Sequence, residues 1–305
     1  MYRLINSDEI SWLLKSFFLT CTHYRKNPFL YYVMRFLLTL KPTADYQSLI
    51  FNYQYPFMSW IYGRLQDSDA EYAHFLHQNG YRLQDSLKTF KHFTFSNFII
   101  PQFAKKIVPG DTCMWIGTTP IQVIVSFYLD KAAQDFIQGL FQDQTLSLYN
   151  HQHRANFIVS HVEVLPPVEL QKTIHLQTIS PIVVSRHRED HTVEYLHPDD
   201  PSYPTFFAYN LYEKYQSLHP HHVRLDPAAA SQLIDFQLIS QKRIKSRLLT
   251  IKENKKEATN IRAYTHFSFA LSGPTDLLEV GFYGGFGRFS ANGLGCCDLI
   301  QPTEN

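Results

Sequence analysis

The sequence predicts an α+β fold built from two tandem ferredoxin-like domains with antiparallel sheets. A chain of 305 residues is long enough for about two domains. In residues 34–165 the expected order is strand, two helices, two strands, helix and strand, which is the split βαβ arrangement of a ferredoxin-like domain. Pro166 and Pro167 then interrupt helix and strand alike, and the elements after them follow a similar order. We therefore place the domains at 34–166 and 167–305.

The first domain contains the clearest helix signals of the chain. Pro56 suits the first turn of a helix. Ser68 and Glu71 form a capping box, and Gly80 follows as a C-terminal stop. The predicted elements are a strand at 34–40, helices at 56–65 and 72–78, strands at 91–100 and 111–118, a long amphipathic helix at 120–142 and a closing strand at 155–165.

The second domain shows a comparable order of elements but no close sequence repeat of the first. We expect a strand at 174–184, an aromatic-rich helix at 205–218, a strand pair or long ribbon at 233–251, a strand at 261–271, a short helix at 276–282 and a last strand at 294–300. The duplication therefore rests on the order of the elements and not on residue identity.

Residues 1–33 precede the first predicted strand. Their apolar run at 12–21 is interrupted by Lys15, is too short to span a membrane and has no small-residue cleavage site. We interpret residues 1–33 as an added N-terminal element or as the product of a start assigned too far upstream, and we expect no membrane partner.

Composition excludes a globally basic protein, because the net charge is only +1. A nucleic-acid surface would have to come from local segregation of charge. Aromatic residues make up 15% of the chain and offer stacking platforms for unpaired bases, although most of them belong to the core. The four cysteines show no C-x-x-C spacing, which favours a reducing cytoplasm. The 15 histidines lack matching ligands, so we expect neither a metal nor another cofactor.

Half of the 12 glycines lie in residues 281–295. Glycine permits positive φ and close approach to the backbone, so we expect an exposed loop whose N–H groups suit phosphate. The context matches neither the dinucleotide fingerprint nor the Walker pattern, which favours a nucleic-acid backbone. A Gly-rich turn or bulge is the alternative interpretation. The candidate RNA-binding residues here are Gly285, Gly287, Arg288, Gly293 and Gly295.

A second candidate RNA-binding feature is a row of cations. Arg243, Lys245 and Arg247 alternate with other residues, so a strand would place all three on one face, where they suit a line of phosphates. The alternative is an ordinary solvated strand face, since exposed edge cations also discourage aggregation.

The paired units Gly285-Phe286-Gly287 and Gly293-Leu294-Gly295 resemble the C-terminal signature of the CRISPR-associated repeat-processing endoribonucleases, the Cas-six family of the RAMP superfamily. Segments 34–40, 91–96 and 179–184 agree in order, so the resemblance covers roughly residues 34–300. It implies RRM-like domains and metal-independent cleavage of CRISPR repeat RNA in the precursor transcript, which releases guide RNAs. It is compatible with a monomer or homodimer and with a place in a multi-subunit interference complex.

The resemblance also implies three catalytic residues. The Tyr of an Ile-Tyr pair matches Tyr62, the His of a Leu-His pair matches His77, and the Lys before the Phe-Thr-aromatic-Ser strand matches Lys91. Metal-free cleavage needs a base for the 2′-OH, an acid for the 5′-oxygen and a cation for the phosphate, and leaves a 2′,3′-cyclic phosphate and a 5′-OH. His74, Lys88 and His92 compete for these roles because they lie close in the sequence.

Two other functions remain open at this point. One is a non-catalytic RRM-like RNA-binding scaffold of a CRISPR ribonucleoprotein complex, which would not need Tyr62, His77 and Lys91 to converge. The other is a metal-dependent nuclease, against which the sequence shows no clustered Asp or Glu motif.

Overall fold

The computed structural model describes residues 33–83, 86, 88–190, 192–239, 244–251 and 259–300. The predicted N-terminal element lies outside this part of the chain, apart from Val33. From Val33 onward the chain forms one compact unit. Within the described ranges, no helix combines the length and apolar composition that crossing a bilayer requires.

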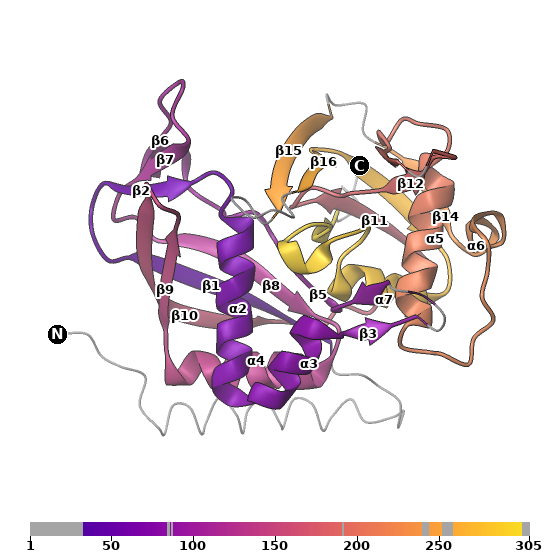
Figure 1. The fold of residues 1–305 in the computed structure, drawn as a ribbon, viewed down its shortest axis with the longest axis horizontal. Helices are drawn as coiled ribbons and strands as arrows, with labels where there is room; N and C mark the ends of the chain where they lie inside the picture. The colour runs from indigo at the N-terminus through magenta and orange to yellow at the C-terminus, as the bar shows by residue number, and fades with distance from the viewer. Residues whose placement is uncertain are drawn as a thin grey trace, which may run out of the picture. The chain divides into compact units, whose positions relative to one another are not determined.

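The first main sheet contains five antiparallel strands in the order β5-β8-β1-β10-β9 (Figure 1). They are β1 (Met34–Pro42), β5 (Phe93–Phe95), β8 (Ile121–Phe127), β9 (Thr145–Tyr149) and β10 (Arg154–Leu165). The alternate side chains Phe36, Leu38 and Leu40 of β1 are fully buried, as expected for a central strand with one face on the core. The predicted first and closing strands are therefore confirmed.

Three helices belong to the same half: α2 (Gln54–Ser68), α3 (Ala70–Gln78) and α4 (Asp130–Gln142). In Figure 1, α2 runs across the front of the first sheet, with α3 and α4 near its lower end. The fully buried Phe57, Ile61 and Leu65 repeat every four residues and form the apolar stripe of α2. Both predicted helices at the start of this half are confirmed. The N-cap of α3, however, is Asp69 and not Ser68, because the Asp69 carboxylate accepts the backbone N–H three residues later.

The predicted long helix at 120–142 is wrong in its first half, which is the strand β8, and is confirmed in its second half, which is α4. Ile121, Val123 and Val125 are β-branched residues at alternate positions, and all three are buried in the sheet. We expected residues 111–118 to form a strand of the first main sheet, but β8 occupies that position. The segment 111–118 instead contains β7 (Cys113–Ile116), which pairs with β2 (Gln47–Ile50) and β6 (Lys105–Lys106) in a small separate sheet.

The second main sheet has the order β14-β17-β11-β18 and is also antiparallel. Its strands are β11 (Thr173–Thr178), β14 (Asp235–Leu238), β17 (Ser268–Ser272) and β18 (Cys297–Leu299), and its helices are α5 (Tyr203–Gln216), α6 (Pro227–Leu233) and α7 (Thr275–Gly284). The Phe207 ring of α5 lies 4.9 Å from the Phe236 ring and 5.7 Å from the Phe269 ring, centroid to centroid, so aromatic contacts join α5 to the sheet. The predicted helices of this half are confirmed.

Several predicted strands of the second half are shorter or divided. β14 belongs to the main sheet, whereas β15 (Lys245–Ile251) pairs with β16 (Thr259–Thr265) in a separate ribbon. The predicted strand at 261–271 is divided between β16 and β17, because His266 has a φ of 64° and turns the chain. The remaining elements are β3 (Tyr81–Arg82), β4 (Thr89–Phe90), β12 (Ser185–His187), β13 (Val193–Tyr195) and the 3₁₀ turns η1 (Gln102–Ala104) and η2 (Ser290–Asn292). The predicted α+β class with antiparallel sheets is confirmed.

Candidate active site

The corner between α2 and α3 brings Tyr62 and His77 together. Their ring centroids lie 5.1 Å apart, and the rings meet edge to face at 85°. Tyr62 also contacts Phe93 of β5 edge to face, at 5.7 Å. His77 lies in the last turn of α3 and is exposed, whereas Tyr62 is half-buried. A phenol held by packing therefore stands beside an imidazole that solvent can reach.

Lys91 joins this corner from the segment between β4 and β5. Its Nζ donates to the backbone carbonyl oxygens of Leu76 and His77, the second at 3.0 Å. Carbonyl groups at the end of a helix lack partners within the helix, so the ammonium satisfies part of the end of α3. Gly80 makes room for it, because a Cβ at this position would lie 2.8 Å from Nζ. The structure thus places two of the sequence-predicted catalytic residues against the third: Tyr62 contacts the ring of His77, and Lys91 contacts its backbone carbonyl.

Burial sets the protonation of two of these groups. It lowers the pKa of Lys91 from 10.5 to about 8. It raises the pKa of Tyr62, so the phenol keeps its proton at neutral pH. The corner therefore holds an amine that loses its proton close to physiological pH, a neutral hydroxyl donor and an imidazole. Such a set can move protons and stabilise charge on a phosphate.

The competing residues have other surroundings. Lys88 Nζ donates to both carboxylate oxygens of the buried Glu213 on α5, at 2.6 and 2.9 Å. His92 is fully buried, and its Nε2 lies 2.9 Å from the hydroxyl of Ser217. His74 is exposed one turn before His77, and within the described part of the chain it shows no contact with the other candidates. These positions favour His77 and Lys91 over His74, Lys88 and His92 as candidates for the catalytic roles.

The expectation of an exposed glycine-rich loop is wrong. Gly285, Gly287, Gly293 and Gly295 have positive φ, from 71° to 84°, as glycine permits, but the segment is buried. Its backbone N–H groups donate within the protein, Phe286 to Gly295 O at 2.8 Å, Arg288 to Val183 O at 2.8 Å and Gly295 to Pro181 O at 2.7 Å. These three amides are therefore unavailable to a phosphate.

The buried glycine segment connects the two halves. A Cβ at Gly293 would overlap the Phe95 ring of β5, so only glycine lets the segment pack against the first sheet. Thr94 Oγ1 donates to Leu294 O at 2.9 Å across the same contact. From α5, the buried ammonium of Lys214 donates to the carbonyl oxygens of Gly285 and Gly287, the second at 3.2 Å. Burial lowers the pKa of Lys214 to about 7.

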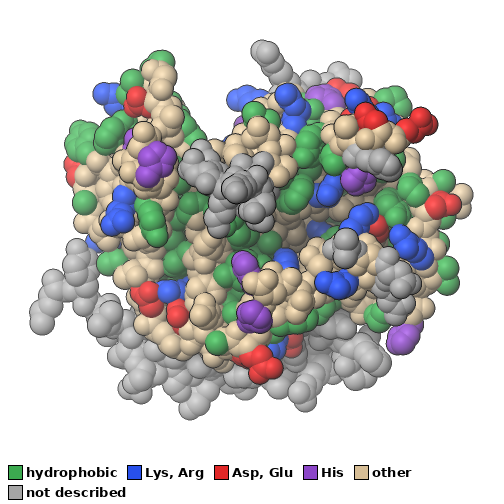
Figure 2. Space-filling view, viewed as in Figure 1, with side chains coloured by type: hydrophobic (Ala, Val, Ile, Leu, Met, Phe, Trp, Pro, Cys, Tyr) green, Lys and Arg blue, Asp and Glu red, His purple; other side chains and the backbone are tan. Residues whose placement is uncertain are grey.

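The predicted row of cations is not a uniform solvent-facing row. Arg243 lies outside the described residues, and Lys245 is exposed on β15. Arg247 instead donates to Phe51 O at 2.7 Å, just before α2. Arg288 is also partly withdrawn from solvent, and its Nη1 donates to the hydroxyl of Ser185 at 2.6 Å. In Figure 2, basic side chains lie on both rims of the hollow at the top of the view, over the β6–β7 hairpin and over the β15–β16 ribbon.

Comparison with known proteins decides the family. The model for the N-terminal part of the CRISPR-associated protein Cas6 matches residues 48–163, and the model for its C-terminal part matches residues 165–299. The chain belongs to the Cas6 family. This is the family that its sequence resembles.

Two curated Cas6 proteins are similar over most of their length. The CRISPR-associated endoribonuclease Cas6 1 of Methanocaldococcus jannaschii is 25% identical over 282 residues, which cover 89% of this chain and 94% of the relative. The endoribonuclease-like protein Cas6nc of Pyrococcus horikoshii is 24% identical over 275 residues, which cover 88% and 100%.

Solved structures agree on the fold. A Cas6-related protein from Pyrococcus furiosus superposes with a TM-score of 0.70 at 20% identity, over 89% of this chain and all of the other. A RAMP protein described as binding different RNA substrates gives a TM-score of 0.67 at 20% identity, over 88% and 100%. These similarities support the two-domain, ferredoxin-like RAMP fold.

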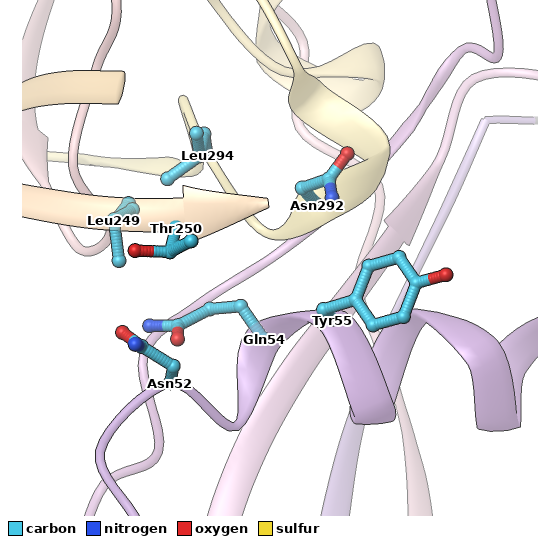
Figure 3. Close-up of a pocket in the computed structure, with 7 residues that line it drawn as sticks. All are labelled: Asn52, Gln54, Tyr55, Leu249, Thr250, Asn292 and Leu294. Atoms are coloured by element: carbon cyan, nitrogen blue, oxygen red, sulfur yellow. The ribbon is translucent and has the colours of Figure 1, made fainter. Parts of the chain in front are cut away.

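This Cas6 chain also has a small pocket that the sequence did not predict. It lies between the start of α2, β15 and η2, is partly open to solvent and has a volume of about 20 Å³, which is room for about one water molecule (Figure 3). Its lining residues are Asn52, Gln54, Tyr55, Leu249, Thr250, Asn292 and Leu294. No local pattern joins residues so distant in the chain, so only the packed structure reveals them. Lys214 was missed for the same reason, because its partners are backbone carbonyls far along the chain.

Proposed function

We propose that this Cas6-family chain is an endoribonuclease that binds CRISPR repeat RNA in the precursor transcript and cleaves it to release guide RNAs. The observation that carries the proposal is that Tyr62 packs against the His77 ring and Lys91 Nζ donates to the His77 backbone carbonyl, at a partly exposed corner. The Methanocaldococcus jannaschii relative is named as an endoribonuclease, which supports the same activity. A non-catalytic scaffold would not require this convergence of acid, base and cation.

In the proposed reaction the ribose 2′-OH attacks the adjacent phosphate without a metal ion. His77 takes the 2′-OH proton as the 2′-oxygen–phosphorus bond forms. Lys91 then gives a proton to the 5′-oxygen as the bond from phosphorus to that oxygen breaks, leaving a 2′,3′-cyclic phosphate and a 5′-OH. A pKa of about 8 suits this acid, because proton transfer is most efficient when the pKa lies near the working pH.

The remaining groups of the corner fit supporting roles. An ammonium group has three N–H donors, and two backbone carbonyls engage Lys91, so one donor can point to the phosphate. Tyr62 stays protonated through burial and packs against the His77 ring, which makes it a neutral donor and an orienting group.

The RNA path is proposed to include Lys245 on the exposed part of β15. Arg243 retains its proposed role in phosphate binding, although it lies outside the described residues. The glycines of the C-terminal segment act in this proposal by supporting the fold beside the site, since the amides discussed above are already engaged. Membership of a multi-subunit interference complex, the monomeric or dimeric state and the cytoplasmic location remain predictions.

The test uses the purified chain and a labelled repeat transcript from the CRISPR array of the same genome. In excess EDTA we expect cleavage that leaves a 2′,3′-cyclic phosphate and a 5′-OH. A transcript with one 2′-deoxy substitution just 5′ of the cleaved phosphate should bind equally and remain intact, because the nucleophile is missing. Cutting of that transcript would require a water nucleophile, and loss of cutting in EDTA would require a metal. Binding without any cutting would favour the scaffold.

A further inference from the structure

Helix α5 of the second half contacts the segment that carries Lys91 on both sides of that residue. Three residues before Lys91, the Nζ of Lys88 donates to both carboxylate oxygens of Glu213, at 2.6 and 2.9 Å. One residue after it, Nε2 of the His92 ring lies 2.9 Å from the hydroxyl oxygen of Ser217. Ser217 follows Glu213 by four residues at the end of α5, so the two side chains lie on the same face of the helix.

The contact before Lys91 is an ion pair whose acidic partner is buried. The Glu213 side chain is 5% exposed, and the Lys88 side chain is 45% exposed. A buried carboxylate without its cation is strongly unfavourable, so this pair holds residue 88 against α5. Lys88 Nζ also lies 5.3 Å from the ring centre of Tyr209, one turn earlier on the same helix. Because β4 follows Lys88 at once and leads to Lys91, the ion pair fixes where that strand begins.

The contact after Lys91 holds a sharp turn of the backbone. His92 has a φ of 54°, in the left-handed region that residues with a Cβ seldom adopt. Such a conformation persists only where the surrounding structure holds it in place. Its ring is fully buried. The Ser217 hydroxyl donates its one proton to the carbonyl oxygen of Lys214 at 2.7 Å, so it accepts from His92 Nε2, which carries the ring proton.

We propose that Glu213 and Ser217 are positioning residues for Lys91. They hold the chain before and after it, so that its ammonium reaches the end of α3 beside His77. A displacement of about 1 Å in a reacting group can cost about a hundredfold in rate, so contacts on the flanking residues matter for the chemistry. The second half of the chain thereby contributes to catalysis in the first. This inference rests on the proposed function, because it takes Lys91 as the acid.

Two versions of the repeat transcript separate positioning of the acid from other effects. One has the ordinary oxygen at the 5′ position of the cleaved bond, and the other has sulfur there. When the phosphorus–sulfur bond breaks, the sulfur leaves with the electron pair as a thiolate, which is stable near neutral pH because the pKa of a thiol is about 8.5. The oxygen leaving group instead needs a proton from Lys91. Attack by the 2′-OH, with His77 as the base, is the same in both.

Single-turnover rates of the full chain on the two transcripts are the measurement. Lys91→Ala should lower the rate on the oxygen transcript by about two to four orders of magnitude and the rate on the sulfur transcript much less. Glu213→Gln and Ser217→Ala should each lower the oxygen rate by about tenfold or more and leave the sulfur rate close to wild type. The matched control is Glu194→Gln, which removes a buried-side ion pair of the same half that does not touch the Lys91 segment and should change neither rate.

The ratio of the oxygen rate to the sulfur rate does not depend on the fraction of folded protein, so a poorly folding variant still gives a result. A variant that keeps the wild-type ratio removes that residue from the proposal, and two such variants overturn it. Equal losses on both transcripts therefore mean a purely structural role. If the wild type cuts both transcripts but Lys91→Ala keeps the wild-type ratio, Lys91 is not the acid and the positioning role is wrong, while the endoribonuclease activity stands. If the wild type cuts neither, the proposed function itself is wrong.

Discussion

The corner of α2 and α3 and the glycine-rich segment after α7 differ in exposure: the corner presents side chains to solvent, and the segment buries its backbone. The corner gathers side chains from residues 62–91, leaves His77 exposed and keeps the amine of Lys91 within reach of it. The glycine segment is buried, and the missing Cβ atoms of its glycines let its backbone pack closely against elements of both halves. Chemistry on RNA needs access, whereas joining two sheets needs close backbone contact.

The difference predicts two separable kinds of variant. His77 of the corner is exposed, so its removal should change the rate of cleavage more than the free energy of unfolding. In the glycine segment even one added methyl group meets a neighbouring atom, so substitution there should change stability first.

The largest expected effect tests the corner. His77→Ala should lower the single-turnover cleavage rate by about two to four orders of magnitude, because general base catalysis contributes this much. RNA affinity and melting temperature should stay close to wild type. His74→Ala, one turn earlier on the same helix, is the matched control. If His74→Ala loses activity and His77→Ala keeps it, the assigned base is wrong.

The next effect tests the glycine segment. Gly293→Ala should lower the free energy of unfolding by about 3 kcal/mol or more, because it adds both a left-handed alanine and an overlap with Phe95. Gly110 also has positive φ but has open space around its Cβ position, so Gly110→Ala should cost only about 1–2 kcal/mol. Denaturant unfolding measures both values. Equal losses would show that packing at Gly293 contributes nothing.

Local patterns were sufficient for much of this fold. Helices α2, α3, α5 and α7 carry their signals in a few neighbouring residues, and the structure contains each of them. The first half of the predicted helix at 120–142 is instead a strand, because burial of Ile121, Val123 and Val125 in a sheet outweighs a local helical pattern. The strand β9 was missed altogether, because a strand of five residues gains its stability from pairing with β10.

The site shows the same limit. Motif positions named Tyr62, His77 and Lys91, and the structure places the first and the third against His77, although their catalytic roles remain a prediction. Glycine density correctly indicated positive φ, but it carried no information on what covers the loop. Burial is a property of the partner surface, here including the Phe95 ring, and no single segment encodes it.

A smaller effect concerns the pH dependence of the corner. Above about pH 8, Lys91 loses its proton, so the cleavage rate should fall by about tenfold per pH unit. Stability should change in the opposite direction. The pKa of Lys91 is lower in the folded chain than its ordinary 10.5, so the unfolded chain binds more protons between pH 8 and 10.5 and the free energy of unfolding rises with pH there.

Parallel measurements separate this titration from alkaline unfolding. Lys91→Arg should show no such alkaline limb, since arginine stays protonated over this range, although its absolute rate will be lower. If the cleavage rate of Lys91→Arg still falls above about pH 8 as in the wild type, the titrating group is a residue other than Lys91.

The smallest expected effect is on the salt dependence of RNA binding, and it is tested at Lys245 and Arg247, two cations of β15. Lys245 is exposed on β15, so Lys245→Ala should reduce the magnitude of the log–log salt slope of single-stranded RNA binding by about 0.7, the value for one lost phosphate contact. Arg247 is held by Phe51 O and Gln54, so Arg247→Ala should leave the slope unchanged and lower the melting temperature. The reverse outcome would mean that Arg247 leaves α2 when RNA binds, and that the contact at the pocket wall is broken in the complex.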